Sequence, residues 1–340
     1  MLVGVERKNM YKSEAIKSKK EFSLIDKPEH IAKLTQLLEK NFEAYFNSLI
    51  NNYRSNDSLE KLKKQWGKNI ALKTDAECIR EIFAYRIDEF EKEAEKYREA
   101  FAQDNLEDCR HDENGFKDYL IKRCPVITKS WGAKNVKELD EWRKLFTMTP
   151  TVVLLDTFEN LINFTADYLE SYDETEYGKY LNTDDFNFNE IEEDEYSIRG
   201  VIGMGIKAIT IYYLYPHIFP KRGKLDLFGM YFLTNQNEPY INLFHFPTKT
   251  SEFIMINDET NGKEGTYKAD QNYWYPYGLF TSYAMKLYRM IVEQCKKMNV
   301  ALDPHYRYVY VDTYLENISK HHSEDIKTLT KSSDITHGKH

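Results

Sequence analysis

Three glycines lie between two cations in the stretch Arg199-Gly-Val-Ile-Gly-Met-Gly-Ile-Lys207. Glycines ahead of a helix let backbone amides converge on an anion, and the amino-terminal end of the helix adds partial positive charge. The spacing matches neither a P-loop nor a dinucleotide fingerprint. We therefore predict an anion site formed by Arg199, Gly203, Gly205 and Lys207. The alternative is that the glycines let the helix pack closely on a neighbour.

A second group of cations follows two prolines. Lys221, Arg222 and Lys224 come directly after Pro216-His-Ile-Phe-Pro220. Because the prolines restrict the backbone, we expect this loop to present the three side chains together to phosphates. Such a basic loop is also typical of ordinary solvated surface.

The third candidate is aromatic. Tyr273, Trp274 and Tyr275 are consecutive and precede Pro276. Exposed rings of this kind would stack on nucleic-acid bases. Buried rings would instead anchor a helix that begins near Pro276.

Patterns that would support catalysis are sparse. If the protein is an enzyme, the site of a metal-dependent hydrolase or nuclease would be drawn from His217, His245, Glu252 and Asp258. Zinc binding is not favoured, because Cys109, His111 and Cys124 supply three ligands without a fourth. No cofactor or metal is therefore predicted. Mg²⁺ or Mn²⁺ belongs only to the enzyme alternative.

Acidity is concentrated in one stretch. Residues 167–195 contain twelve carboxylates and one basic residue, Lys179, a net charge of -11. The rest of the chain has 46 basic and 43 acidic residues, so the overall charge of -8 does not argue against an anionic partner. Because like charges repel, the segment is interpreted as a solvated connector. Its interleaved aromatic residues favour the alternative, an acidic element that docks on a basic partner or shields the protein's own basic surface.

The elements that would position these residues are mostly helical. Apolar residues at steps of three and four predict long helices that begin near Pro28 and after Thr74, where Glu77 completes a capping box. A further helix is predicted from Pro150 to about Tyr172, with enough apolar residues to be largely buried.

After the acidic stretch the pattern changes. Helices are predicted from about Gly205 to Tyr215, from Leu225 to Leu233 and from Pro276 to Met298. Residues 240–246 and 252–256 are short and β-prone. Residues 306–311 alternate as a strand would, although Asp303-Pro304 could equally start a helix.

The predicted fold class is therefore predominantly α, with a helical amino-terminal body and a smaller mixed α/β carboxy-terminal region. A length of 340 residues favours two domains or one large one. Composition divides the chain into a loosely ordered arm (1–27), a helical domain (28–166), an acidic connector (167–197), a mixed α/β domain (198–317) and a polar tail (318–340).

Four widely spaced cysteines and the lack of a secretion-type leader lead us to expect an intracellular, cytoplasmic protein. The lack of a long apolar run excludes a membrane span.

The leading hypothesis is a non-catalytic binding protein that contacts nucleic acid or another polyanion through basic and aromatic loops of its carboxy-terminal half. The alternatives are the metal-dependent hydrolase or nuclease and a protein-interaction scaffold subunit of a larger complex.

Overall fold

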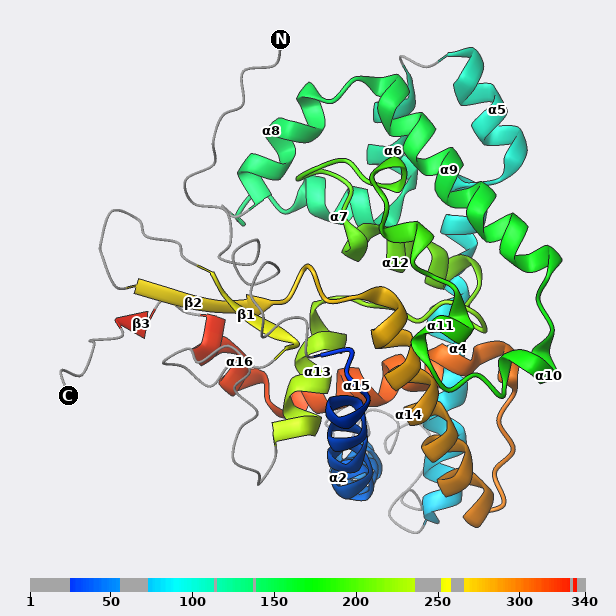
Figure 1. Cartoon of the computed structure of the whole chain (residues 1–340), viewed down its shortest axis with the longest axis vertical. Helices are drawn as coiled ribbons and strands as arrows, with labels where there is room; N and C mark the ends of the chain where they lie inside the picture. The colour runs from blue at the N-terminus through cyan, green and yellow to red at the C-terminus, as the bar shows by residue number, and fades with distance from the viewer. Residues whose placement is uncertain are drawn as a thin grey trace, which may run out of the picture. The chain divides into compact units, whose positions relative to one another are not determined.

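The computed structural model describes residues 25–55, 73–112, 115–136, 139–235, 252–257, 266–330 and 333–334, and this part of the chain is predominantly α-helical (Figure 1). It forms two compact units, each assembled from separate stretches of sequence. Unit 1 comprises Met1–Leu49, Lys224–Tyr275 and Tyr314–His340, and unit 2 comprises Ile50–Gly223 and Pro276–Thr313. These units are not the successive segments that composition suggests, because contacts join residues that are far apart in the chain.

Unit 1 contains most of α2 (Pro28–Ser55), α13 (Lys224–Asn235), the end of α15 (Arg307–His321) and α16 (Ser323–Thr330). The predicted apolar face of α2 is buried, including Leu38 and Phe46. Its Phe42 ring lies 5.1 Å from the ring of Tyr314 on α15. Gly229 on α13 permits close helix packing, since a Cβ atom there would meet the Leu315 carbonyl oxygen at 2.6 Å.

The described strands also belong to unit 1. β1 (Ile254–Asn257), β2 (Thr266–Gln271) and β3 (Ser333–Asp334) form an antiparallel sheet in the order β1-β2-β3, with Ile254 opposite Gln271 (Figure 1). The strand predicted within 252–256 is thus present, and the one at 240–246 lies outside the described residues. A mixed α/β region is not supported, because helices supply most of the described structure after residue 198.

Two further predictions for the carboxy-terminal part need correction. The segment 306–311 is not a strand: a 3₁₀ turn, η7 (Pro304–Tyr306), capped by Asp303 leads into α15. The alternation of residue types did not mark a solvated face, because four consecutive residues of the segment are buried: Tyr308, Val309, Tyr310 and Val311. The polar tail predicted from 318 is also not separate from the folded structure, since Ile318 is buried on α15 and α16 follows.

Unit 2 is a helical assembly. Its longer helices are α4 (Asp75–Ala100), α9 (Thr151–Glu170), α12 (Met204–Leu214) and α14 (Tyr277–Lys297), and its shorter ones are α5 (Gln103–His111), α6 (Phe116–Arg123), α7 (Pro125–Gly132) and α8 (Asp140–Met148). The predicted capping box of α4 is confirmed, with reciprocal bonds between Thr74 and Glu77. α9 buries one face only, because Val152 and Val153 are exposed.

Helix α12 differs from the amphipathic helices around it because it is apolar on most of its surface. It contacts α4, α7 and α9 and buries Ala208, Ile211 and Tyr212. The Tyr97 ring of α4 stacks on Tyr213 of α12 with 4.7 Å between centroids. A helix packed on several sides places even its charged residues in the interior. This packing determines the environment of Lys207.

Candidate functional site

The predicted glycine-rich stretch forms a tight turn before α12. Ile198 and Ile202 exchange two backbone hydrogen bonds of 2.9 Å, and Gly200 between them has a φ of 72°. This left-handed conformation favours glycine. Ser197 and Gly203, which flank the bonded pair, are both extended, so the register places them opposite each other.

The space around Gly203 and Gly205 decides between the two predicted roles of these glycines. A Cβ atom built at either position would meet nothing within 4 Å, so close helix packing does not account for them. Gly203 is the N-cap of α12 and provides no side-chain cap. The amides of Met204 and Gly205 have no hydrogen-bond partner among the described residues. The amino-terminal end of α12 is therefore open and provides two donors.

Lys207 occupies a different position from the one predicted. Its side chain is 1% exposed and donates hydrogen bonds to the Ile191 carbonyl oxygen and to Oγ of Ser197, the latter at 2.7 Å. Burial is the main cause that lowers the pKa of Lys207, to about 8, assisted by nearby Arg222 and opposed by Glu192. Lys207 therefore does not reach a phosphate at the surface. It pairs with the half-buried Ser197, one helical turn from Gly203.

The proline-flanked cations are not presented together. Arg222 is buried, and Lys221 lies 2.9 Å from Asp312 in an ion pair within unit 2. Lys224 belongs to unit 1, where it is 3.4 Å from Asp270. Two of the three cations are paired with carboxylates of the protein itself and the third is buried, so this arrangement does not favour a phosphate-binding loop. Arg199, at the tip of the turn before α12, remains exposed.

The aromatic cluster and Glu252 come together in unit 1. Tyr275 is buried, as the anchoring alternative predicted, and its hydroxyl donates to Glu252 at 2.6 Å. The other oxygen of this buried carboxylate interacts with Nε2 of His30. Tyr273 is exposed and donates to Asp270 at 2.8 Å, while Trp274 is half-buried. Of the three residues predicted to stack, Tyr273 and Trp274 retain exposed surface, and Tyr275 does not.

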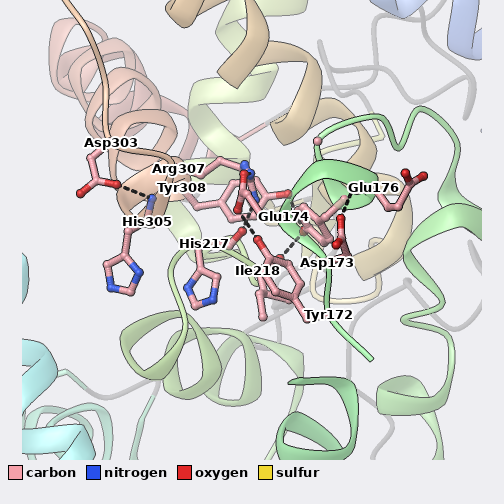
Figure 2. Close-up of polar contacts among 12 residues, drawn as sticks. Tyr172, Asp173, Glu174, Glu176, His217, Ile218, Asp303, His305, Arg307 and Tyr308 are labelled. Atoms are coloured by element: carbon pink, nitrogen blue, oxygen red, sulfur yellow. Dashed lines mark hydrogen bonds and ion pairs between the residues drawn. The ribbon is translucent and has the colours of Figure 1, made fainter. Parts of the chain in front are cut away.

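His217 lies in a polar cluster of unit 2 that the sequence did not predict. Figure 2 shows its imidazole beside that of His305, and the two rings stack with 5.0 Å between centroids. Tyr172 contacts the His217 ring edge-on at 5.2 Å. Burial, His305 and Arg307 lower the pKa of His217 to about 4. The imidazole is therefore neutral at neutral pH and a weak general base.

Arg307 lies at the centre of this cluster. Its buried guanidinium pairs with Glu174 and donates to the His217 carbonyl oxygen (Figure 2). It also lies 4.8 Å from the centroid of the Tyr177 ring and 5.2 Å from that of Tyr288. The carboxylate and the two ring faces compensate the buried charge. The arrangement is that of a structural ion pair, in which Nε of Arg307 alone lacks a hydrogen-bond partner among the described residues.

The acidic segment is folded into unit 2 and is not a solvated connector. It includes α10 (Glu174–Tyr177), α11 (Thr183–Phe186) and two 3₁₀ turns, η5 (Glu190–Glu192) and η6 (Asp194–Tyr196). Five of its apolar side chains are buried: Tyr177, Phe186, Phe188, Ile191 and Tyr196. All twelve of its carboxylate residues are exposed: Asp167, Glu170, Asp173, Glu174, Glu176, Asp184, Asp185, Glu190, Glu192, Glu193, Asp194 and Glu195.

Several backbone and side-chain contacts fix this segment in place. Arg289 of α14 donates to the carbonyl oxygens of Gly178 and Tyr180, at 2.8 and 2.7 Å. Glu192 accepts a hydrogen bond of 2.5 Å from the amide of Tyr277, the first residue of α14. Glu192, Glu193, Asp194 and Glu195 together line a shallow depression. The carboxylates at 192–195 are therefore attached to a rigid support.

The metal-dependent alternative gains no support from the described residues. His245 and Asp258 lie outside them, and no group of three or more His, Cys, Asp or Glu side chains suited to a metal ion occurs within them. Cys109, Cys124 and the other two cysteines are free thiols. In the described part of the chain, no helix combines the length and hydropathy that a membrane crossing requires.

Comparison with protein-family models finds no matching family, and comparisons with curated proteins and with solved structures find no match.

Proposed function

We propose that the chain is a binding protein that docks a basic protein partner on its acidic segment, residues 167–197. One observation carries this proposal: every carboxylate of residues 167–195 is exposed, while five apolar side chains of the segment are buried. Carboxylates are normally exposed, so exposure alone is not informative. The distinctive feature is a dense negative charge on a folded support.

The segment is not a removable shield. Burial of a large apolar side chain contributes about 2 kcal/mol, so detaching its five buried side chains would cost roughly 10 kcal/mol. Binding of an external anion would have to offset this cost, so the shielding alternative is not favoured. A fixed surface, in contrast, binds without an ordering cost of its own.

Charge determines the chemistry of the partner. Neighbouring carboxylates about 7 Å apart in water repel each other by roughly 0.5 kcal/mol. A partner rich in Lys and Arg relieves this repulsion and is attracted over about one Debye length, about 8 Å at physiological salt. Within 190–195, the side chains of Glu193, Asp194 and Glu195 have no ion-pair partner among the described residues. These are the carboxylates that we assign to the partner.

The test neutralises this surface without changing its shape. A fluorescent Lys- and Arg-rich peptide is titrated with wild type and with Glu193→Gln/Asp194→Asn/Glu195→Gln, and affinity is read from anisotropy. The matched control, Asp104→Asn/Asp108→Asn/Asp118→Asn, removes the same charge from α5 and α6. We expect the first variant to bind at least about tenfold more weakly, since each charged contact contributes up to about 1 kcal/mol. An equal loss of affinity in both variants would show that only the net charge of the protein matters, and it would overturn the proposal.

One observation favours a second candidate, anion binding by the turn before α12. Gly203 and Gly205 border open space, the amides of Met204 and Gly205 lack partners among the described residues, and Arg199 is exposed nearby. The carboxylates of 192–195 precede this turn and would repel a polyanion. We therefore rank nucleic-acid binding below the binding of a basic protein partner.

A cytoplasmic location also stays a prediction.

A further inference from the structure

We propose that Ser197 and Lys207 form a nucleophile and general base for acyl transfer from esters. This goes beyond the binding function, and the reactive pair includes none of the carboxylates assigned to the partner. Oγ of Ser197 and Nζ of Lys207 are 2.7 Å apart, within the range needed for proton transfer. A serine becomes a useful nucleophile when an adjacent base accepts its proton, and lysine serves as that base in Ser–Lys enzymes.

The surroundings of Lys207 suit this role. A lysine acts as a base only when it is neutral, and burial of Lys207 favours the neutral form. Arg222 also favours the neutral form, whereas Glu192 opposes it, and the resulting pKa is about 8. The neutral amine keeps its hydrogen bond to the Ile191 carbonyl oxygen and turns its lone pair toward Ser197. Two contacts thus hold Nζ in one position.

The turn before α12 supplies the rest of the site. The register around the Ile198–Ile202 pair places Ser197 opposite Gly203, and Lys207 follows one turn later, its amide bonded to the Gly203 carbonyl oxygen at 3.2 Å. Open space borders Gly203 and Gly205. The amides of Met204 and Gly205, unpartnered among the described residues, are the donors that would stabilise an oxyanion. Glycine at 203 leaves room for a substrate where a side chain would intrude.

The reaction needs no group beyond substrate and water. Oγ of Ser197 attacks the ester carbonyl carbon while its proton moves to Nζ of Lys207. The bond from that carbon to the leaving oxygen then breaks, and Lys207 returns the proton to the departing alkoxide. Water next attacks the acyl-serine as Lys207 accepts one of its protons. Collapse releases the carboxylic acid, and the proton returns to Oγ of Ser197.

The neighbouring charges define the substrate class. Glu192, Glu193, Asp194 and Glu195 lie two to five residues before Ser197 and are all exposed. This negative field disfavours anionic substrates and favours esters of neutral or cationic alcohols. Between acetate esters of a cationic and an anionic alcohol, the cationic ester is expected to react faster. The opposite preference would overturn this assignment of substrate class.

Labelling with a fluorescent fluorophosphonate tests the pair directly, because the reagent forms a phosphonyl ester with an activated serine and releases fluoride. We expect the label at Ser197 by peptide mass mapping and none at that position in Ser197→Ala. Ser171→Ala, which removes another serine of unit 2, should label like wild type. Lys207→Met is expected to slow labelling by about 100-fold, the contribution of a general base.

Because Lys207 is buried, its variants could fail to fold, so a second measurement uses wild type alone. The labelling rate should rise with pH with a midpoint near 8, the pKa of Lys207. Absence of label from Ser197 in folded wild type between about pH 6 and pH 10 would overturn the proposal. Equal labelling of wild type and Ser197→Ala would also overturn it.

Discussion

The buried guanidinium of Arg307, 1% exposed, pairs with the carboxylate of Glu174, which is 46% exposed. The pair joins the acidic segment to the start of α15, and Arg307 also holds the His217 carbonyl oxygen (Figure 2). The two partners are unequal: water replaces a lost contact at Glu174 but not at Arg307. This inequality makes the effects of substitution predictable.

Glu174→Gln should lower the free energy of unfolding of unit 2 by about 1–3 kcal/mol, because it leaves a buried charge without its counter-charge. In an Arg307→Met background the same substitution should cost less than about 0.5 kcal/mol, since Glu174 is then solvated. Urea unfolding of the four proteins measures the coupling. Glu176→Gln, which breaks only the exposed pair with Lys179, is the control. A Glu174→Gln cost that persists without Arg307 would refute this account of the pair.

His217 should make the protein sensitive to mild acid. Its pKa is about 4 in the folded chain, against about 6.5 in the unfolded chain. Between these values the unfolded state binds a proton that the folded state does not, so the free energy of unfolding falls as pH decreases from about 6.5 to about 4, by at most about 3 kcal/mol.

His217→Gln removes this proton linkage and should flatten the pH dependence of unfolding in that window. The control is His111→Gln, which alters an exposed residue at the end of α5. Unfolding midpoints measured at several pH values compare the slopes. A slope unchanged from that of wild type would show that His217 does not carry the effect.

Two glycines on helices should respond oppositely to alanine. Gly205 borders open space at the start of α12, so Gly205→Ala should raise the free energy of unfolding by up to about 1 kcal/mol through reduced unfolded-state entropy. Gly229→Ala should lower it by about 2 kcal/mol, because the new Cβ atom would overlap the Leu315 carbonyl oxygen. Thermal unfolding of both variants gives the signs, and a gain for Gly229→Ala would contradict the packing described for α13.

The helices could be predicted from sequence because their signals are local. The Thr74–Glu77 capping box, the apolar face of α2 and the end of α12 before Pro216 each require only neighbouring residues. The prediction that 167–197 is a solvated connector was wrong. It gave more weight to the charge of the segment than to its aromatic residues, which are buried within unit 2. The unit boundaries also depend on contacts between distant residues and could not be read from composition.

The candidate site was predicted only in part. Gly203 and Gly205 were correctly associated with a helix start, but Lys207 was expected at the surface. Its burial follows from the packing of α12 on several helices, which the sequence near Lys207 does not specify. The sequence did not indicate Ser197 as a site residue, because its contact with Lys207 depends on the turn at Gly200. The apolar residues on all sides of α12 were the available signal for a buried lysine.

The central claim is tested most directly by whether the protein binds a positively charged or a negatively charged ligand. Two fluorescent ligands of equal length, a Lys- and Arg-rich peptide and a single-stranded oligonucleotide, are titrated with wild type at low and at physiological salt. We predict that the peptide binds and that its affinity weakens as salt rises. We also predict that the oligonucleotide does not bind, because the exposed carboxylates of 167–195 form a dense negative charge that repels it. Salt-sensitive binding of the oligonucleotide without binding of the peptide would contradict the account.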